Sequence, residues 1–230
     1  MPSLAIHPFY ESHREAMEAA MRQRLDFAEP LLRERTQLAD LDAIRREVMD
    51  EFEVVLSQLP DVGGAPNRMS DFFMRLIGFL ALGRVLRRHG IATPLIGEIG
   101  RETLRAQLLT VPEAERLAAG RQFMSPENQA LVREQAARSA TQRHRTAFPQ
   151  DFVYDFVEPG PGDEFEFGID YKACGFCKFA ARHGDQEILP SLCGLDFDAY
   201  STRGIRLVRT QTLAGGASHC NFRFSRLAPD

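Results

Sequence analysis

The sequence has little that points to nucleic acid, membranes or secretion. Its 230 residues carry 28 basic and 32 acidic side chains, so it lacks the basic excess that binds phosphate backbones. No run of 18 apolar residues is present, which excludes a membrane-spanning helix. The first residues lack the basic and apolar stretches of a secretory signal. We therefore expect a cytoplasmic protein whose partners include neither nucleic acid nor membrane.

Common catalytic motifs are also missing. There is no glycine-rich phosphate loop, no serine nucleophile elbow and no His-Glu-x-x-His helix. Only four cysteines occur, and in a cytoplasmic protein these are thiols or metal ligands more often than disulfides. The 44% hydrophobic and 26% charged composition is that of a globular protein.

The character of the chain changes near residue 150. All four cysteines and both lysines, Lys172 and Lys178, lie beyond that point. The first 150 residues carry 20 basic and 20 acidic side chains, whereas the last 80 carry 8 and 12. We predict a helical region over 1–148 and an α+β region over 149–230, joined in one globular unit.

The first region has the residues that typically begin and end helices. Apolar residues recur every three or four positions over 67–89, and Gly90 suits the position after a helix end. Ser12 with Glu15 fits a capping box, and Pro30 predicts a kink or break in the helix over 13–36. The weakly apolar stretch 126–146, which Ser125 would cap, predicts an exposed helix that packs on another subunit, so a homo-oligomer is a further expected partner.

The last 80 residues predict the order strand, strand, helix, helix, strand, strand. Aromatic residues alternate with polar ones over 152–157 and 164–171, with a Pro-Gly turn between, as in an antiparallel hairpin. Helices over 173–182 and from 185 or 190 to 202 follow, then strands over 205–210 and 220–225. The fold class is therefore α+β, with the helical region packed on a four-stranded antiparallel sheet and two helices.

The cysteines fall where these elements meet. Cys174 and Cys177 share one face of the first helix, Cys193 lies in the second, and alternation puts Cys220 on the apolar face of the last strand with His219 opposite. One interpretation is a pocket of thiols between helices and sheet. The other is that Cys193 and Cys220 are small buried hydrophobes.

Three kinds of chemistry fit this pattern. A cysteine at a helix N-terminus can form a stabilised thiolate and attack an electrophilic carbon, with Asp170 and Asp196 for proton transfer or substrate binding. Four cysteines can also hold zinc, although their spacing lacks the second tight pair of a zinc ribbon. Disulfide exchange at Cys174 and Cys177 ranks last, because a hairpin precedes them rather than a βαβ unit.

Several blocks of the last third, taken together, resemble the L-2-amino-thiazoline-4-carboxylic acid hydrolase family. They are 152–157 (FVYDFV), 165–171 (FEFGIDY), 174–179 (CGFCKF), 192–197 (LCGLDF), 209–215 (RTQTLAG) and 220–224 (CNFRF). The resemblance covers about residues 150–226. It implies a hydrolase of a small cyclic carbon–nitrogen substrate, such as one that opens a thiazoline ring to give N-carbamoyl-L-cysteine.

This resemblance selects the candidate site. Cys177 or Cys174 would be the nucleophile, and Asp170 and Asp196 the proton-transfer or amine-binding groups. The expected substrate-binding residues are Tyr171, Cys193, Arg209, Cys220 and Arg223. Each arginine would clamp a carboxylate with its guanidinium fork, or else simply face solvent from its strand.

A more distant resemblance gives the alternative function. The stretch from Gly216 to Cys220 is similar to the ending of vinyl-reductase-type small-molecule-binding domains, some of which hold zinc through cysteines and a carboxylate. Here Arg209 and Thr212 stand where an acid and a thiol would be needed. The alternative is thus a non-catalytic module that binds a small molecule or zinc, while the hydrolase is expected to need no cofactor.

Overall fold

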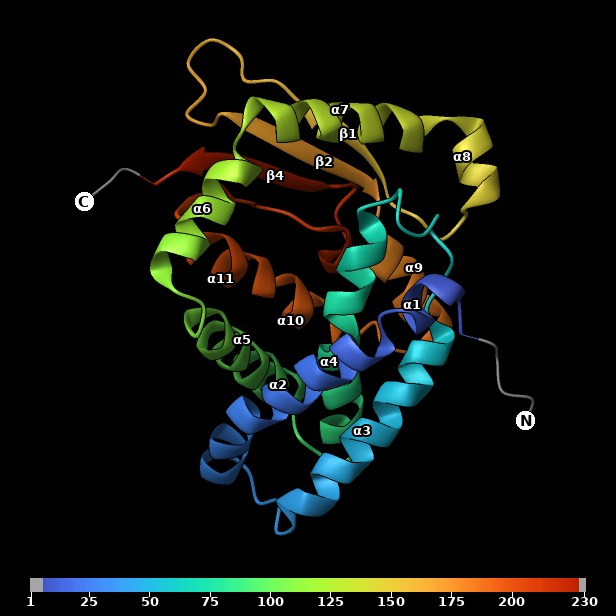
Figure 1. Cartoon of the computed structure of the whole chain (residues 1–230), viewed down its shortest axis with the longest axis vertical. Coiled ribbons are helices and arrows are strands. Elements are labelled where there is room, and N and C mark those ends of the chain that lie inside the picture. The colour runs from blue at the N-terminus through green and yellow to red at the C-terminus, as the bar shows by residue number, and fades with distance from the viewer. Residues whose placement is uncertain (1–5, 228–230) are drawn as a thin grey trace.

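Eight helices make up the first part of the computed structural model, which describes residues 6–227 (Figure 1). In chain order they are α1 (Pro8–Glu11), α2 (Arg14–Arg35), α3 (Leu41–Gln58), α4 (Met69–Arg88), α5 (Thr93–Leu109), α6 (Glu113–Phe123), α7 (Pro126–Ala140) and α8 (Gln142–Ala147). No helix among the described residues is both long and apolar enough to cross a membrane.

Helix α4 is buried around most of its circumference, and α2, α3 and α5 pack against it. The sequence predicts this helix and its end. After His89, Gly90 takes φ +78°, a value that suits glycine, and its N–H donates to Arg87 O. The N–H of Ile91 donates to Leu86 O at 3.0 Å, which completes a Schellman motif.

The sequence predicted a kink or break at Pro30 and a capping box at Ser12, and neither the break nor the capping box forms. The helix runs unbroken through Pro30, because Ala28 and Leu32 on the same stretch are buried in the core and hold it in place. The capping box does not form either. Helix α2 starts at Arg14, one residue later than that box requires, and the Ser12 hydroxyl donates to Phe9 O in the preceding turn.

Helix α7 begins as predicted, with the Ser125 hydroxyl accepting from Asn128 N–H. It lies along β1 (Val153–Val157), at the top of Figure 1. Val132, Ala136 and Ser139 are buried in that contact. One face of α7 therefore packs on the chain's own sheet, and the contact with another subunit stays a prediction.

The remaining elements build the predicted α+β unit. They are β1, β2 (Phe167–Ala173), α9 (Gly175–His183), α10 (Leu189–Cys193), α11 (Leu195–Ser201), β3 (Ile205–Val208), the short 3-10 helix η1 (Leu213–Gly215) and β4 (Cys220–Arg226). The strands form one antiparallel sheet in the order β1-β2-β4-β3. The single second helix that the sequence predicted is divided at Gly194 into α10 and α11.

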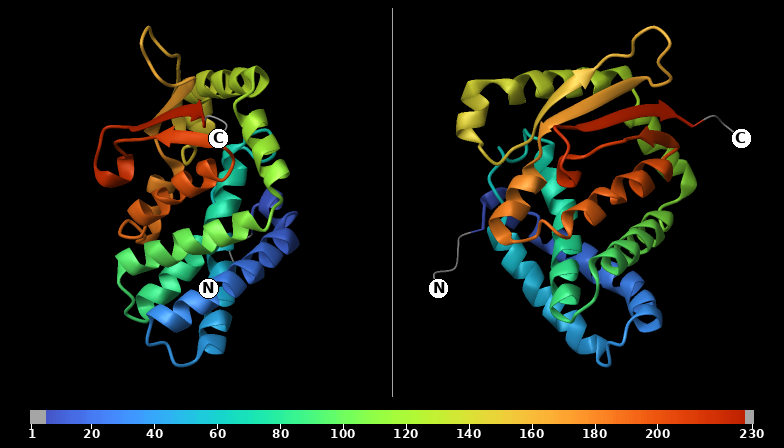
Figure 2. Two further views of the ribbon diagram at one scale, coloured as in Figure 1. Left: turned by 90° about the vertical axis from the view of Figure 1, so that its left-hand side faces the viewer. Right: turned by 180° about the vertical axis from the view of Figure 1, so that it is seen from behind.

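The sheet has one covered and one polar face. The aromatic side chains of β2 and β4 point toward α6, α10 and α11, and Phe167 and Phe224 are fully buried there. Figure 2 shows α10 and α11 between the sheet and α5. The opposite face carries charged residues such as Asp155, Lys172 and Arg206. This alternation is the one that the sequence predicts.

An ion-pair cluster links the helical region to the second part. The Arg84 guanidinium on α4 donates to both carboxylate oxygens of Asp185, which follows α9, and to Glu51 of α3. Asp185 is fully buried. The two parts also share one hydrophobic core, which contains side chains from α2 to α7 and from the sheet.

Candidate active site

Cys174 and Cys177 lie where β2 passes into α9. Cys174 is the N-cap of α9 and Cys177 lies in its first turn. Gly175 between them is needed for a close approach, because a Cβ there would come within 2.8 Å of Gln150 O and of the Phe152 ring. The chain before β1 therefore fixes the position of the first turn of α9.

The two thiols have opposite tendencies to ionise. A hydrogen bond from the Cys174 thiol lowers the pKa of Cys177, although partial burial opposes this. The same contact, together with burial, raises the pKa of Cys174 well above its usual value. Cys177 is thus the thiol of this pair that ionises first, and the position at a helix N-terminus favours an anion there.

Cys193 and Cys220 complete a group of four thiols on the covered side of the sheet. Cys193 ends α10, and Cys220 begins β4 and accepts from Leu213 N–H at 3.2 Å. Burial raises the pKa of both, to about 12 for Cys193. Both lie close enough to Cys177 for its charge to affect their titration. The four cysteines therefore lie in one neighbourhood, near enough for their charges to interact but without forming a tight cluster, and Cys177 is the acidic member.

Asp196 and Arg209 form an ion pair beside these thiols. Arg209 Nη1 donates to Asp196 Oδ2 at 2.6 Å, and Arg209 Nη2 donates to Cys193 O at 2.7 Å. The guanidinium lies between the rings of Phe197 and Phe222, with its centre 4.9 Å from each centroid. Only 5% of the Arg209 side chain is exposed. This strand arginine is therefore a buried contact of α10 and α11 rather than a solvent-facing residue.

Burial raises the pKa of Asp196 to about 6, even though the charge and hydrogen bond of Arg209 act in the opposite direction. A carboxyl with such a pKa is present in both protonation states near neutral pH. It can therefore donate a proton to a leaving group and accept one from water. The Asp196 charge also contributes to the raised pKa of the neighbouring Cys193.

Asp170 and Arg223 lie on the opposite, polar face of the sheet. Arg223 Nη1 donates to Asp170 Oδ1 at 2.7 Å, and Lys172 Nζ and His219 Nε2 are 3.7 and 3.8 Å from Asp170 Oδ2. The structure thus separates these two predicted site residues from the thiols. His219 lies opposite Cys220, as the alternation in β4 predicts.

Tyr171, by contrast, is on the covered face with the thiols. Its ring contacts those of Phe152, Tyr154 and Phe222. Register pairs it directly with Cys220 on β4. Burial raises the pKa of its hydroxyl well above the usual value, so this group stays protonated and can act as a donor.

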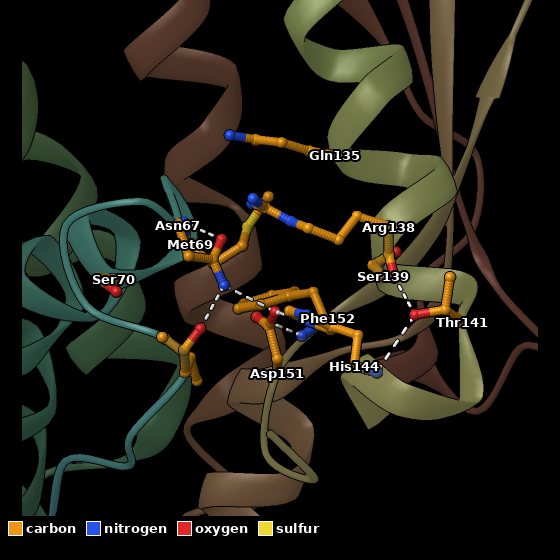
Figure 3. A network of polar contacts seen from close by, with 12 residues as sticks. Asn67, Met69, Ser70, Gln135, Arg138, Ser139, Thr141, His144, Asp151 and Phe152 are labelled. Carbon is orange, nitrogen blue, oxygen red and sulfur yellow. Dashed lines mark hydrogen bonds and ion pairs between the residues drawn. The ribbon is translucent and has the colours of Figure 1, made fainter. Parts of the chain in front are cut away.

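The sequence analysis did not identify a buried network that supports α9 (Figure 3). Asp151 Oδ2 accepts from Asn67 Nδ2 at 2.7 Å and lies 2.7 Å from His144 Nε2. Lys178, next to Cys177, donates to Asp151 O at 2.6 Å. No local pattern in the sequence linked His144 to an asparagine 77 positions earlier (144 − 67).

The four thiols do not amount to a metal site. Within residues 6–227, no group of three or more His, Cys, Asp or Glu side chains has the arrangement needed to hold a metal ion. The zinc form of the alternative function therefore has no candidate ligand set in this part of the chain.

Comparison with known sequences identifies the family. The sequence model of the L-2-amino-thiazoline-4-carboxylic acid hydrolase family matches residues 89–224, more than half of the chain. The protein belongs to this family. No curated protein and no solved structure matches the chain.

The match to the L-2-amino-thiazoline-4-carboxylic acid hydrolase family extends beyond the blocks that carry the resemblance in the sequence. It begins at residue 89 and so includes α5, which packs on α10 and α11, and α7, which packs on β1, together with α6 and α8. All four cysteines, Asp196 and Arg209 lie inside it. The first four helices, α1 to α4, precede it.

Proposed function

We propose that this protein is a hydrolase of small cyclic amidine-type substrates, and that it opens L-2-amino-thiazoline-4-carboxylate to N-carbamoyl-L-cysteine. The observation that carries the proposal is Cys177, a thiol with a lowered pKa at the start of α9, which shares a neighbour with the Asp196–Arg209 pair, because the charges of all three residues act on Cys193. A nucleophile beside a group that can donate a proton suits addition to a carbon–nitrogen double bond. Membership of the family supports the choice of substrate.

In the first step, the Cys177 thiolate adds to the ring carbon that carries the amino group, and the ring nitrogen takes up a proton from solvent. The bond between this carbon and the ring sulfur then breaks. The ring sulfur leaves as a thiol after receiving the proton of Asp196, whose pKa of about 6 allows it to be protonated in part of the molecules. The product of this step is an isothiourea bound to the Cys177 sulfur.

In the second step, water adds to the isothiourea carbon and gives a proton to the Asp196 carboxylate. The carbon–sulfur bond to Cys177 breaks and the thiolate is regenerated, while the remaining hydroxyl proton passes to solvent as the urea carbonyl forms. The released molecule carries a urea group, as N-carbamoyl-L-cysteine does, and one water has been consumed overall. Arg209 acts as a positioning residue in this scheme, because its guanidinium already holds Asp196 and the end of α10.

The test is to incubate the purified full chain with L-2-amino-thiazoline-4-carboxylate and to measure N-carbamoyl-L-cysteine by mass spectrometry. Turnover is expected in the wild type. A loss of at least 100-fold is expected in Cys177→Ser, because a serine hydroxyl does not ionise near neutral pH and is a weaker nucleophile than a thiolate. Trapping of a mass adduct on Cys177 after rapid acid quench would support the covalent step.

Asp170→Asn is the matched control, since Asp170 lies across the sheet from the thiols. It is expected to keep turnover within about threefold of the wild type, whereas Asp196→Asn is expected to lose most of it. Binding of the substrate without any turnover by the folded wild type would favour the non-catalytic small-molecule-binding module. Full activity of a Cys174→Ala, Cys177→Ala double variant would exclude the thiol as nucleophile.

A further inference from the structure

A cavity lies among the helices that precede the family match. A cavity of about 250 Å³ opens between α2, α3 and α4. Its buried wall is formed by Met17, Phe52, Ile77 and Arg24, and exposed side chains such as Asp71 stand at its edge. None of the four cysteines, Asp196 or Arg209 contributes to its lining.

Arg24 is the unusual residue in this wall. Only 8% of it is exposed, and its Nε is buried without a hydrogen-bond partner. Throughout residues 6–227 no carboxylate lies within ion-pair distance of its guanidinium, and burial alone lowers the pKa of Arg24 to about 10. The side chain therefore remains charged at neutral pH. A buried charge without a partner is costly, so such a group in a cavity wall points to a missing anion.

The surrounding residues hold the guanidinium in place. It lies over the Phe79 ring, with its central carbon 3.9 Å from the centroid. Its Nη1 occupies the space beside Gly78, where a Cβ would come within 2.0 Å of that nitrogen. Arg24 falls on the stripe of α2 that also buries Met21 and Ala28, which is why it faces inward. The charged group is thus fixed before any ligand arrives.

We propose that this cavity binds a small monocarboxylate with a compact apolar body, such as an arylacetate, and that Arg24 contacts its carboxylate. The charge of Arg24 calls for an anion, and a guanidinium fork matches a carboxylate. The apolar walls of Met17, Phe52 and Ile77 suit a hydrocarbon body. An apolar cavity of about 150 Å³ is enough for benzene, so the volume here accommodates an aromatic ring and a carboxylate.

The experiment is isothermal titration of the full chain with phenylacetate, compared with phenylacetamide, which has the same shape and no charge. The wild type is expected to bind phenylacetate with a dissociation constant at least tenfold lower than that for the amide. In Arg24→Met, which keeps an apolar stem, phenylacetate binding is expected to weaken at least tenfold and the preference over the amide to disappear.

Two variants locate the binding. Arg22→Met removes an exposed arginine two residues away, outside the cavity, and is expected to leave the dissociation constant unchanged. Cys177→Ser alters the thiol group and is also expected to leave it unchanged. Because Arg24→Met removes an unpartnered buried charge, this variant should fold, as the thermal unfolding midpoint will show.

Three results would overturn the proposal. The first is an absence of phenylacetate binding by the folded wild type at millimolar concentration. The second is equal binding by wild type and Arg24→Met. The third is loss of binding in Cys177→Ser, which would place the ligand at the thiols instead.

Discussion

Arg209 Nη1 lies 2.6 Å from Asp196 Oδ2, and this pair joins the end of β3 to α11 beside the four thiols. The pairing lowers the pKa of Asp196, yet burial has the larger effect and the net value is about 6. The relationship therefore keeps Asp196 in place while leaving it able to take up and release a proton near neutral pH.

The raised pKa of Asp196 makes a prediction for stability. Its value of about 6 lies above the ordinary 3.8, so the folded state binds the proton more tightly than the unfolded state. Its contribution to stability is complete below pH 3.8 and is lost as the pH rises toward 6. We expect the free energy of unfolding of the wild type, relative to Asp196→Asn, to fall by about 1 to 2 kcal/mol between pH 4 and pH 7.

This range is reduced from the full linkage value because 34% of the Asp196 side chain is exposed to solvent. Urea unfolding of both proteins at several pH values provides the measurement. The difference between the two curves isolates the titration of Asp196 from the constant effect of losing the Arg209 contact. Parallel curves across this pH range would show that burial does not raise the pKa of this group.

The thiols should react at different rates. Because the contact with Cys174 lowers the pKa of Cys177 while burial raises that of Cys193 and Cys220, iodoacetamide should alkylate Cys177 first at pH 7. Cys174→Ala removes the hydrogen bond and should slow alkylation of Cys177 several-fold. Peptide mass spectrometry over a time course measures each rate.

Cys193→Ala serves as the control for that experiment, since Cys193 does not contribute to the lowered pKa of Cys177. The rate at Cys177 should be the same as in the wild type. Faster modification of Cys193 or Cys220 than of Cys177 in the wild type would contradict the assignment of Cys177 as the acidic thiol.

The buried pair of Arg84 and Asp185 should be important for stability. Asp185 is fully buried and accepts three hydrogen bonds from the Arg84 guanidinium. Asp185→Asn leaves the arginine charge without this partner and should lower the free energy of unfolding by about 3 to 5 kcal/mol. Glu187→Gln, at a side chain that is 79% exposed, should change it by less than about 0.5 kcal/mol. Denaturant unfolding of both variants distinguishes these outcomes.

The network around Asp151 should stabilise the segment that leads into β1 and the contact of this segment with α9. Asp151→Ala removes the acceptor for Asn67 Nδ2 and for Phe152 N–H, both of them buried, and should lower the free energy of unfolding by about 2 to 4 kcal/mol. The exposed Asp155→Ala on the next strand should have little effect. A loss below about 1 kcal/mol for Asp151→Ala would mean that water replaces the carboxylate without cost.

Local patterns in the sequence were sufficient for the strands and the first helix of the last 80 residues, although not for the division of the second helix at Gly194. Alternation identified the strands and put Cys220 on the covered face, and Gly90 marked the end of α4. These features depend on neighbours within a few positions. The resemblance through the cysteine blocks also gave the family, because those blocks are linear segments of the chain.

Only the tertiary structure decided the rest. It kept α2 continuous through Pro30, since burial of the surrounding apolar residues outweighs one lost helical hydrogen bond. It placed Asp196 with Arg209 beside the thiols and Asp170 across the sheet, although both aspartates carry the same carboxyl group and the sequence made both candidates. It also buried Arg24 in a cavity wall. The sequence by itself determined which side chains are available and which face of a helix or strand they share. Which side chains of different elements meet depends on how the elements pack, because contacts between distant segments leave no periodic pattern in either segment.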